Sequence, residues 1–362
     1  MEHKRKIIAT VINDVVFDQR MIRICNTLSE FYSVELWGRI KSSESTIEHS
    51  FIQRRFRFFI NRGVLFYISY NIRLFFILLF TKFDVIHSVD LDTLPASFLA
   101  CKIKRKQIVY DSHEYFTEVP ELENRYFVKK IWLIIEKIFV PRVDVAITVG
   151  DNIAKIYFEK YKKQFHVVRN CPEIHSSTSN HSEDRYIIYQ GALNKGRGLE
   201  SLIKAMKTIP LRLLIAGDGD IRYKLENMVI KEQLSDKVIF LGQIKPDKLI
   251  NYTSQAFLGY NVMENIGLSY YYSLSNKFFD YIHSDVPVIT NPFPEYYDLN
   301  KTYNCCVFAE AIPNNISEVI LSLLNDNKEY NRLKSNCNKA SKDLNWNSEK
   351  NKLILAYDDL IQ

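Results

Sequence analysis

The sequence is poor in the residues and motifs that mark metal, redox and phosphate-loop proteins. Only 11 of its 362 residues are glycine, and none completes a Walker loop or the GxGxxG pattern of dinucleotide-binding folds. Its six cysteines include no CxxC pair and no zinc-like spacing, so we expect reduced, buried thiols in a cytosolic protein. The N-terminus has no apolar run of signal-peptide length, and no HExxH or GxSxG motif indicates a hydrolase.

What is present is an ordinary globular composition. Hydrophobic residues make up 47% of the chain and charged residues 25%, and a length of 362 residues predicts two domains. The formal net charge of +6 is modest and unevenly distributed. A nucleic-acid-binding protein would need a wider basic surface, so we do not expect nucleic acid as a partner.

Short apolar runs alternate with helical patterns along both halves of the chain, which indicates parallel sheets covered by helices. The polar stretch Ile174–Arg185 has the composition of a linker between the halves. We therefore predict an α/β protein with two doubly wound domains, whose ligands bind where strands end. The predicted strands are 7–13, 34–39, 84–90, 107–113, 143–150, 166–173, 186–193, 211–219, 238–244, 256–262, 286–290 and 305–309.

A short helix in the second half has the features of a ligand site. It spans 276–283, follows a polar loop and can be capped by Ser273 or Ser275. Lys277 falls in its first turn, where the helix dipole disfavours a cation, so the helix amides and the lysine together predict an anion site. Asp280 follows one turn later on the same face. The alternative is an ordinary surface helix with an i,i+3 ion pair.

Two glycine turns follow predicted strands. Gly191 begins a loop in which Lys195 and Arg197 place cations at a helix N-terminus, a combination that suits a pyrophosphate. The alternative is a glycine turn with solvated basic residues. Gly217 belongs to a second turn, whose aspartates, like those of Asp90–Asp92, match a DxD metal motif only weakly.

Polar residues also stand at the end of a predicted strand in the first half. Asp111, His113 and Glu114 occupy the position at which such sheets hold their sites. His113 could bind a sugar hydroxyl or transfer a proton. The alternative is a partly buried histidine that a neighbouring carboxylate satisfies.

Between Phe51 and Lys82 the chain has no acidic residue and is rich in aromatic and aliphatic side chains. Val64–Phe80 contains Asn71 and an arginine, and is short and polar for a membrane span. The pattern instead predicts adsorption to an anionic membrane surface, the alternative being a core helix with a solvated basic side. The basic residues assigned to this contact are Arg54, Arg55, Arg62 and Arg73.

Two further helices are predicted. Tyr126–Phe139 carries apolar residues at helical spacing, which predicts one broad buried face. Asn345–Ile361 is helical at the C-terminus. The apolar positions of the first helix are 127, 128, 131, 134, 135 and 138.

Taken in order, these motifs resemble those of glycosyltransferase family 4, retaining nucleotide-sugar enzymes of the GT-B fold that build bacterial surface polysaccharides. The resemblance covers nearly the whole chain and implies an acceptor-binding domain at 1–170, completed by the C-terminal helix at 345–362, and a donor-binding domain at 171–344. It rests on FDVIHSVDLDTLPA, VYDSHEYF, DVAITVGDNIAKIYFEKY, YQGALNKGRGLESLIKAM, SLSNKFFDYIHSDVPVIT and WNSEKNKLILAYDDL.

The resemblance assigns roles to individual residues. Arg197 would meet the donor pyrophosphate, and Asp280 would bind the ribose hydroxyls in place of the family's usual glutamate. Lys277 would stabilise the leaving diphosphate, and His113 would bind the transferred sugar near the anomeric centre. The other donor-side residues are Gly191, Lys195, Gly217, Ser269 and Asn276, and the acceptor-side residues are Asp111 and Glu114.

Two positions depart from the family pattern. Ala192 stands where many members have a second phosphate-binding arginine, whose charge Lys195 or Lys277 would supply. The first glutamate of the family's Glu-x7-Glu pattern would fall at Tyr272. The loop Gly267–Ser269 would instead offer backbone donors to the sugar.

The implied reaction moves a hexose-type sugar, with front-face substitution and retention, from a UDP- or GDP-sugar to a lipid-linked or oligosaccharide acceptor. It requires no cofactor and no obligatory metal, and the enzyme would work in the cytoplasm, peripherally on the inner face of the cell membrane. Two alternatives stay open: a nucleotide-sugar 2-epimerase of the same fold, and a non-catalytic sugar-nucleotide-binding subunit. An oxidoreductase is disfavoured because neither half carries GxGxxG.

Overall fold

The computed structural model describes residues 4–41, 48–174 and 185–360, so positions 175–184 of the predicted linker lie outside the described residues. The chain divides into two compact units. Unit 1 contains residues 1–170 and 349–362, and unit 2 contains residues 171–348. The end of the chain therefore completes a unit that is formed mainly by the first half of the sequence.

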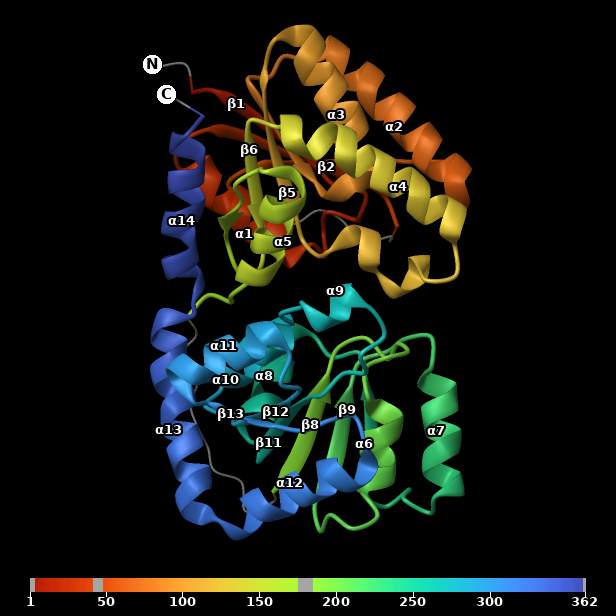
Figure 1. Cartoon of the computed structure of the whole chain (residues 1–362), viewed down its shortest axis with the longest axis vertical. Coiled ribbons are helices and arrows are strands. Elements are labelled where there is room, and N and C mark those ends of the chain that lie inside the picture. The colour runs from red at the N-terminus through yellow and green to blue at the C-terminus, as the bar shows by residue number, and fades with distance from the viewer. Residues whose placement is uncertain (1–3, 42–47, 175–184, 361–362) are drawn as a thin grey trace. The chain divides into compact units, whose positions relative to one another are not determined.

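Unit 1 is built on a parallel sheet in the order β3-β2-β1-β4-β5-β6-β7, with helices on both faces (Figure 1). Its strands are β1 (Lys6–Thr10), β2 (Ser33–Arg39), β3 (Ile52–Phe56), β4 (Val85–Val89), β5 (Gln107–Ser112), β6 (Val145–Thr148) and β7 (His166–Val167). Its helices are α1 (Gln19–Ser29), α2 (Gly63–Phe80), α3 (Asp90–Lys104), α4 (Tyr126–Phe139), α5 (Asp151–Tyr161) and the end of α14 (Trp346–Asp358), with single 3-10 turns at Phe116–Glu118, Pro120–Leu122 and Val140–Arg142.

Unit 2 repeats this architecture with a parallel sheet in the order β10-β9-β8-β11-β12-β13. Its strands are β8 (Tyr186–Gln190), β9 (Arg212–Ala216), β10 (Val238–Gly242), β11 (Leu258–Asn261), β12 (Val288–Thr290) and β13 (Cys306–Phe308). Its helices are α6 (Leu199–Ala205), α7 (Arg222–Lys231), α8 (Pro246–Ser254), α9 (Leu268–Tyr271), α10 (Asn276–His283), α11 (Pro294–Tyr303), α12 (Pro313–Asn325) and α13 (Asn327–Asp343).

Parallel pairing positions the candidate sites. In unit 1, Ile8 pairs with Ile86 and Ile86 with Ile108, so the central strands run in register through a wholly apolar layer. Their carboxyl ends reach the same edge of the sheet, where polar side chains follow the last buried apolar residue. The predicted pair of doubly wound α/β domains is confirmed. All six cysteines are buried, as expected.

Two elements were not predicted. The edge strand β3 has the sequence IQRRF, whose basic residues mask the alternation typical of a strand. Its arginines form ion pairs: Arg54 with Glu35 at 2.6 Å, and Arg55 with Asp14 at 2.7 Å. The four-residue helix α9 lies within the stretch predicted as a polar loop, and is too short to leave a periodic pattern.

The orientation predicted for α4 is wrong, although its bounds are correct. Its fully buried residues are Trp132 and Glu136, while Phe127 is 80% exposed. Glu136 is drawn inward because Thr117 donates to one of its oxygens at 3.1 Å and the Tyr161 hydroxyl to the other at 2.5 Å. A buried acidic side chain therefore turns the apolar row of α4 outward.

Candidate functional site

Lys277 is the central residue of the site in unit 2. It is the second residue of α10, it is 8% exposed, and its Nζ lies 4.2 Å from the ring centroid of Tyr189. Within the described part of the chain, no carboxylate lies within 4.0 Å of Nζ, so the ion pair with Asp280 is not formed. Burial, and then the nearby Arg197 guanidinium, lower the pKa of Lys277 well below its usual value.

The N-terminus of α10 has no side-chain cap. Ser275 occupies the N-cap position, but its Oγ donates to Asn261 Oδ1 at 2.7 Å. Ser273 Oγ donates to the carbonyl of Tyr270 at 2.8 Å, so the prediction that one of these serines caps the helix is wrong. The positive end of the helix dipole thus adds to the charge of Lys277.

Arg197 supplies a second cation, and it has no carboxylate partner among the residues that the structure describes. It lies in the loop between β8 and α6, with its guanidinium 4.9 Å from the ring centroid of Tyr270. Its Nη1 donates to Met263 Sδ at 3.5 Å, and its Nε is buried without a hydrogen-bond partner among the described residues. Lys277, Arg197 and the N-terminus of α10 together make this site positively charged, so its charge favours binding of an anion.

Glycine lets the strand ends approach one another at this site. Gly217 has φ +144°, and a Cβ there would lie 1.9 Å from the carbonyl oxygen of Gly191. At the N-cap of α6, Gly198 has φ +66°, and a Cβ would lie 2.5 Å from the carbonyl oxygen of Val262. The loop of Arg197 is thereby held against the end of β11.

Asp280 is oriented by the last residue of β8. Its Oδ2 accepts a hydrogen bond from Gln190 Nε2 at 2.9 Å, while Gln190 Oε1 accepts from Thr253 Oγ1 at 2.7 Å. Gln190 is 5% exposed and was not predicted as a site residue. The only sequence signal for it was its position at the end of a strand, before the glycine loop.

The remaining donor-side residues differ in placement. Ser269 is buried on α9, beside the tyrosine that packs on Arg197. Asn276 and Gly191 are exposed at the rim. Lys195 is also exposed, and no described contact joins it to Lys277 or Arg197.

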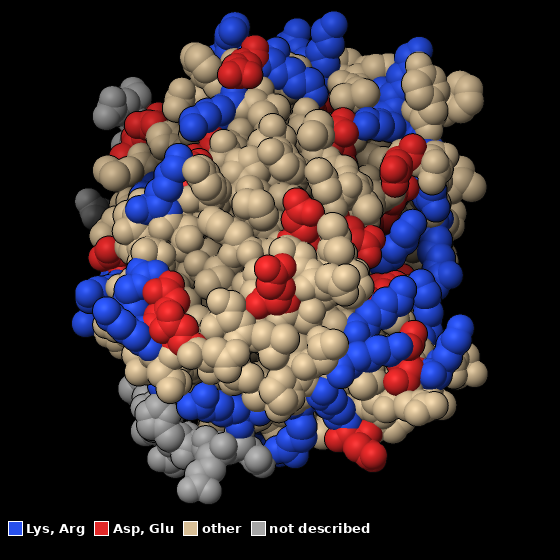
Figure 2. Space-filling view, turned by 60° about the horizontal axis from the view of Figure 1, so that its bottom comes forward, with Lys and Arg blue, Asp and Glu red and all other residues tan. Residues whose placement is uncertain are grey.

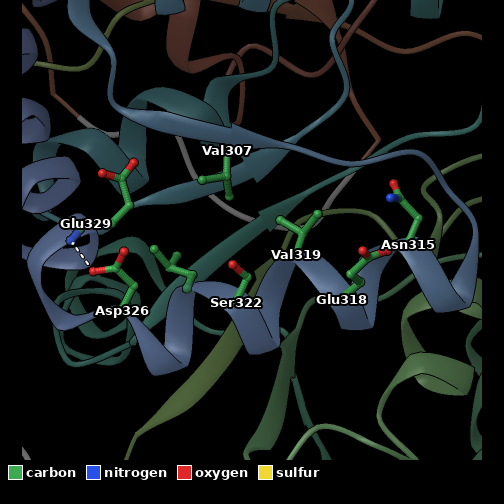
Figure 3. A pocket seen from close by; sticks show the side chains of 8 residues that line it. Val307, Asn315, Glu318, Val319, Ser322, Asp326 and Glu329 are labelled. Atoms are coloured by element: carbon green, nitrogen blue, oxygen red, sulfur yellow. Dashed lines mark hydrogen bonds between the residues drawn. The ribbon is translucent and has the colours of Figure 1, made fainter.

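A pocket of about 390 Å³ lies elsewhere in unit 2, between β13, α12 and the start of α13 (Figure 3). Its apolar lining residues are Val307, Val319 and Leu323. Glu318, Asp326 and Glu329 give it an acidic lining that would repel a diphosphate. We therefore place the anion site at α10 rather than here.

Unit 1 contains a buried cluster of charged and polar groups at the end of β5. Asp111 is fully buried, and Arg20 donates to both of its oxygens, at 2.9 and 3.2 Å from Nη2. Nε2 of His113 lies 3.1 Å, and Nε2 of His87 3.3 Å, from Asp111 Oδ2. Although burial disfavours its charged form, Arg20 and His113 hold the pKa of Asp111 well below its usual range.

His113 is fixed by two carboxylates. Burial lowers its pKa, but Asp111 and then Asp90 outweigh that effect and raise the pKa to about 9. Asp90 Oδ1 also accepts from the His113 amide at 2.9 Å, and Asp90 itself has φ +54°. Glu114 is exposed, and its carbonyl accepts a hydrogen bond from Ser112 Oγ at 2.8 Å. The protonated imidazole can donate a hydrogen bond but cannot act as a base at neutral pH.

Both halves of the chain match known protein families. Residues 21–173 match the model of glycosyltransferase family 4, and residues 171–340 match that of glycosyl transferases group 1. These are the two domains of a GT-B glycosyltransferase.

Solved structures share the fold of the whole transferase chain. Sucrose-phosphate synthase from Thermosynechococcus elongatus superposes with a TM-score of 0.82 at 18% identity, covering 99% of both chains. Anabaena HepE in complex with UDP-glucose superposes with a TM-score of 0.76 at 14% identity, covering 98% of this chain and 99% of that one. An uncharacterized glycosyltransferase of Methanocaldococcus jannaschii is 38% identical over 71 residues, which span only 18% of either chain.

The residues assigned to membrane contact do not all face solvent in the transferase. The side chain of Arg55 is 12% exposed and directed to Asp14, which removes it from any such contact. Arg54 is half-exposed but paired with Glu35. Arg62 is exposed at the N-cap of α2, and Arg73 is exposed above the ring of Phe58.

A larger apolar surface lies on two helices of unit 1, which meet where the rings of Tyr67 and Trp132 lie 5.3 Å apart. We call it the α2–α4 face. Among the described residues, α2 is the helix long and apolar enough to cross a membrane, but Phe66, Tyr70, Leu74 and Leu78 anchor one of its sides in the core. The exposed apolar residues of the face are Val64, Leu65, Ile68, Ile72, Phe76 and Phe80 on α2, and Phe127, Ile131, Ile134 and Ile138 on α4.

Away from the α2–α4 face, the surface of the transferase carries both basic and acidic side chains. On the face shown in Figure 2, acidic side chains stand among uncharged ones near the centre, and basic side chains lie mainly toward the edges.

The ion pairing of His113 predicts a pH-dependent contribution to stability. A histidine whose pKa rises on folding stabilises the protein fully below its ordinary pKa near 6.5, and this stabilisation is lost as the pH rises through about 9. We expect wild type to exceed His113→Asn in free energy of unfolding at pH 6, and the difference to shrink by pH 9.5. Denaturant titrations of both proteins at the two pH values measure this. An equal difference at both would contradict the assigned ion pairing.

Proposed function

We propose that the protein transfers a hexose-type sugar, with retention of configuration, from a UDP- or GDP-sugar to a lipid-linked or oligosaccharide acceptor in bacterial surface polysaccharide synthesis. The observation that carries the proposal is the pair of cations in unit 2, Lys277 and Arg197, neither of which has a carboxylate partner among the described residues. Such a pair suits a diphosphate, the group that leaves when a nucleotide sugar reacts.

In the proposed reaction, different residues would contact the leaving diphosphate, the ribose and the transferred sugar. As the sugar–phosphate bond breaks, negative charge grows on the diphosphate, and preorganised cations and helix amides lower the barrier to that step. Asp280, oriented by Gln190, would accept hydrogen bonds from the ribose. His113 would donate a hydrogen bond to the transferred sugar. Because two side chains supply the positive charge, the proposal requires no divalent cation.

Product analysis tests the reaction. The purified protein is incubated with UDP- and GDP-hexoses, with and without acceptors, and nucleotide release and sugar products are quantified in the presence of EDTA. Transfer that needs an acceptor, retains configuration and persists in EDTA supports the proposal. Turnover of donor alone to an isomeric sugar nucleotide would instead show an epimerase. Donor binding without turnover across acceptors would show a binding subunit.

We also propose that unit 1 docks on the inner face of the cell membrane through the α2–α4 face. Exposed basic side chains, among them Arg62, Lys130 and Lys137, surround this face. An apolar centre with a basic rim fits an anionic lipid surface, where the helices would lie in the plane of the interface. A lipid-linked acceptor would then be held close to the enzyme.

Removing apolar side chains from α4 is expected to weaken membrane binding. Each exposed isoleucine that enters the interface contributes about 1 kcal/mol or more, so the double variant Ile131→Ser, Ile134→Ser should bind vesicles at least about tenfold more weakly. Sedimentation with vesicles containing anionic lipid measures this. The control is Leu355→Ser, which removes a 62% exposed leucine from α14. Equal binding by the double variant and the control would exclude the α4 contact.

A further inference from the structure

A row of buried polar groups connects the last helix of the chain to His113. The Tyr357 hydroxyl on α14 lies 2.7 Å from His87 Nδ1, and His87 Nε2 lies 3.3 Å from Asp111 Oδ2. The same oxygen lies 3.1 Å from His113 Nε2. Tyr357 is 1% exposed, and His87 and Asp111 are fully buried. Tyr357 and His113, which are 357 − 113 = 244 positions apart in sequence, are thus joined through three hydrogen bonds.

The chemistry of the row fixes where its hydrogens lie. An ionised Asp111 can only accept hydrogen bonds, so both histidines must carry a hydrogen on Nε2. In the tautomer that carries this single ring hydrogen, Nδ1 is the acceptor and faces the Tyr357 hydroxyl, which donates. Tyr357 therefore selects the His87 tautomer that can donate to Asp111, in the way that an outer hydrogen-bond partner fixes the ring of a metal-bound histidine.

The surrounding groups leave this arrangement little freedom. Arg20 on α1 holds the other side of Asp111 and donates from Nη1 to the carbonyl of Val168 at 2.8 Å. The rings of Tyr357 and His87 are stacked, 6.2 Å apart and 9° from parallel. The ionisable groups that act on His113 are Asp111, Asp90, Asp92 and Arg20, and those near Tyr357 are Cys25, Tyr32 and Asp111.

We propose that His87 and Tyr357 are positioning residues, which hold Asp111, and through it the His113 imidazole, in the orientation used for the transferred sugar. The role in transfer rests on the proposed function, but the hydrogen-bonded row does not. Because Tyr357 belongs to α14, the orientation of His113 depends on the docking of a helix from the far end of the sequence.

The test is the variant Tyr357→Phe, which keeps the stacked ring and removes the hydroxyl. Without the Tyr357 hydroxyl, the tautomer of His87 is no longer fixed, and His87 donates a weaker hydrogen bond to Asp111. The negative charge of Asp111 then acts more strongly on His113. We expect His113 to titrate at higher pH by nitrogen-15 NMR, the His87 Nε2 hydrogen to exchange faster with water, and kcat to fall about tenfold with the donor KM nearly unchanged. The control is Tyr32→Phe, whose ring lies 5.9 Å from that of Tyr357 but outside the row.

A second variant keeps the test decisive. In His87→Gln, the amide of the new side chain can donate to Asp111 whether or not Tyr357 has its hydroxyl. In that background, adding Tyr357→Phe should therefore change neither the His113 titration nor kcat. Full additivity of the two substitutions would overturn the proposal, as would an unchanged His113 titration in Tyr357→Phe. The NMR measurements need no substrate. A shifted titration in a protein that performs no transfer would therefore support the row and refute the proposed function.

Discussion

Replacing Lys277 with methionine is expected to abolish sugar transfer and, at the same time, to stabilise the substrate-free protein. The ammonium is 8% exposed, rests on the face of Tyr189 and has no described carboxylate partner. A buried charge without a counterion costs folding free energy, which an apolar side chain of similar length would recover. A buried cation such as Lys277, which lowers the stability of the protein, is typical of a site where a bound ligand supplies the negative charge.

The two effects have separate measurements. We expect kcat to fall about 10²- to 10³-fold, the usual consequence of removing one charge-stabilising group, and the free energy of unfolding to rise by about 1 kcal/mol. Saturating donor should stabilise wild type but not the variant. Lys248→Met, which removes an exposed lysine from α8, is the control and should change neither quantity. A Lys277→Met protein that is inactive and also less stable would indicate a structural role instead.

Arg197→Gln is the second substitution with a large expected effect. The guanidinium is held by cation–π contact with Tyr270 and a weak bond to Met263, and its buried Nε has no described partner. Its donors are therefore available to a phosphate, with which arginine forms strong paired hydrogen bonds. We expect kcat/KM for the donor to fall about 10²-fold or more.

Removal of Arg197 should also affect its neighbour. The guanidinium contributes to the low pKa of Lys277, so in Arg197→Gln that pKa should rise. Donor binding by calorimetry across pH would show both changes. The control is Arg212→Gln, an exposed arginine at the opposite, amino end of β9. Donor affinity equal to that of wild type in Arg197→Gln would remove this residue from the site.

The sequence predicted the architecture because parallel sheets have a pattern that sequence retains. Buried strands such as β6 and β9 contain continuous apolar runs, VAI and LLIA, and α10 was predicted with its correct bounds from its apolar spacing. Lys277 could be found because it breaks a local rule, a cation in the first turn of a helix.

Other features depend on contacts that a sequence does not display. Nothing in IQRRF marks Arg55 as the partner of a buried aspartate, and the outward row of α4 looks like a core face until Glu136 is seen to be buried. The roles of Gln190, His87 and Tyr357 follow from partners 90, 24 and 270 residues away. Such pairings require the fold before they can be recognised.

The interleaving of the two units has a consequence for protein synthesis. Unit 2 is encoded without interruption, whereas unit 1 lacks residues 349–362 until the ribosome has made all of unit 2. At about 5–20 residues per second, the intervening 178 residues take about 10 to 35 s, during which unit 1 exists without the helix that carries Tyr357. Throughout this interval His87 lacks its Tyr357 partner, so the hydrogen-bonded row that ends at His113 is completed only after α14 has been made.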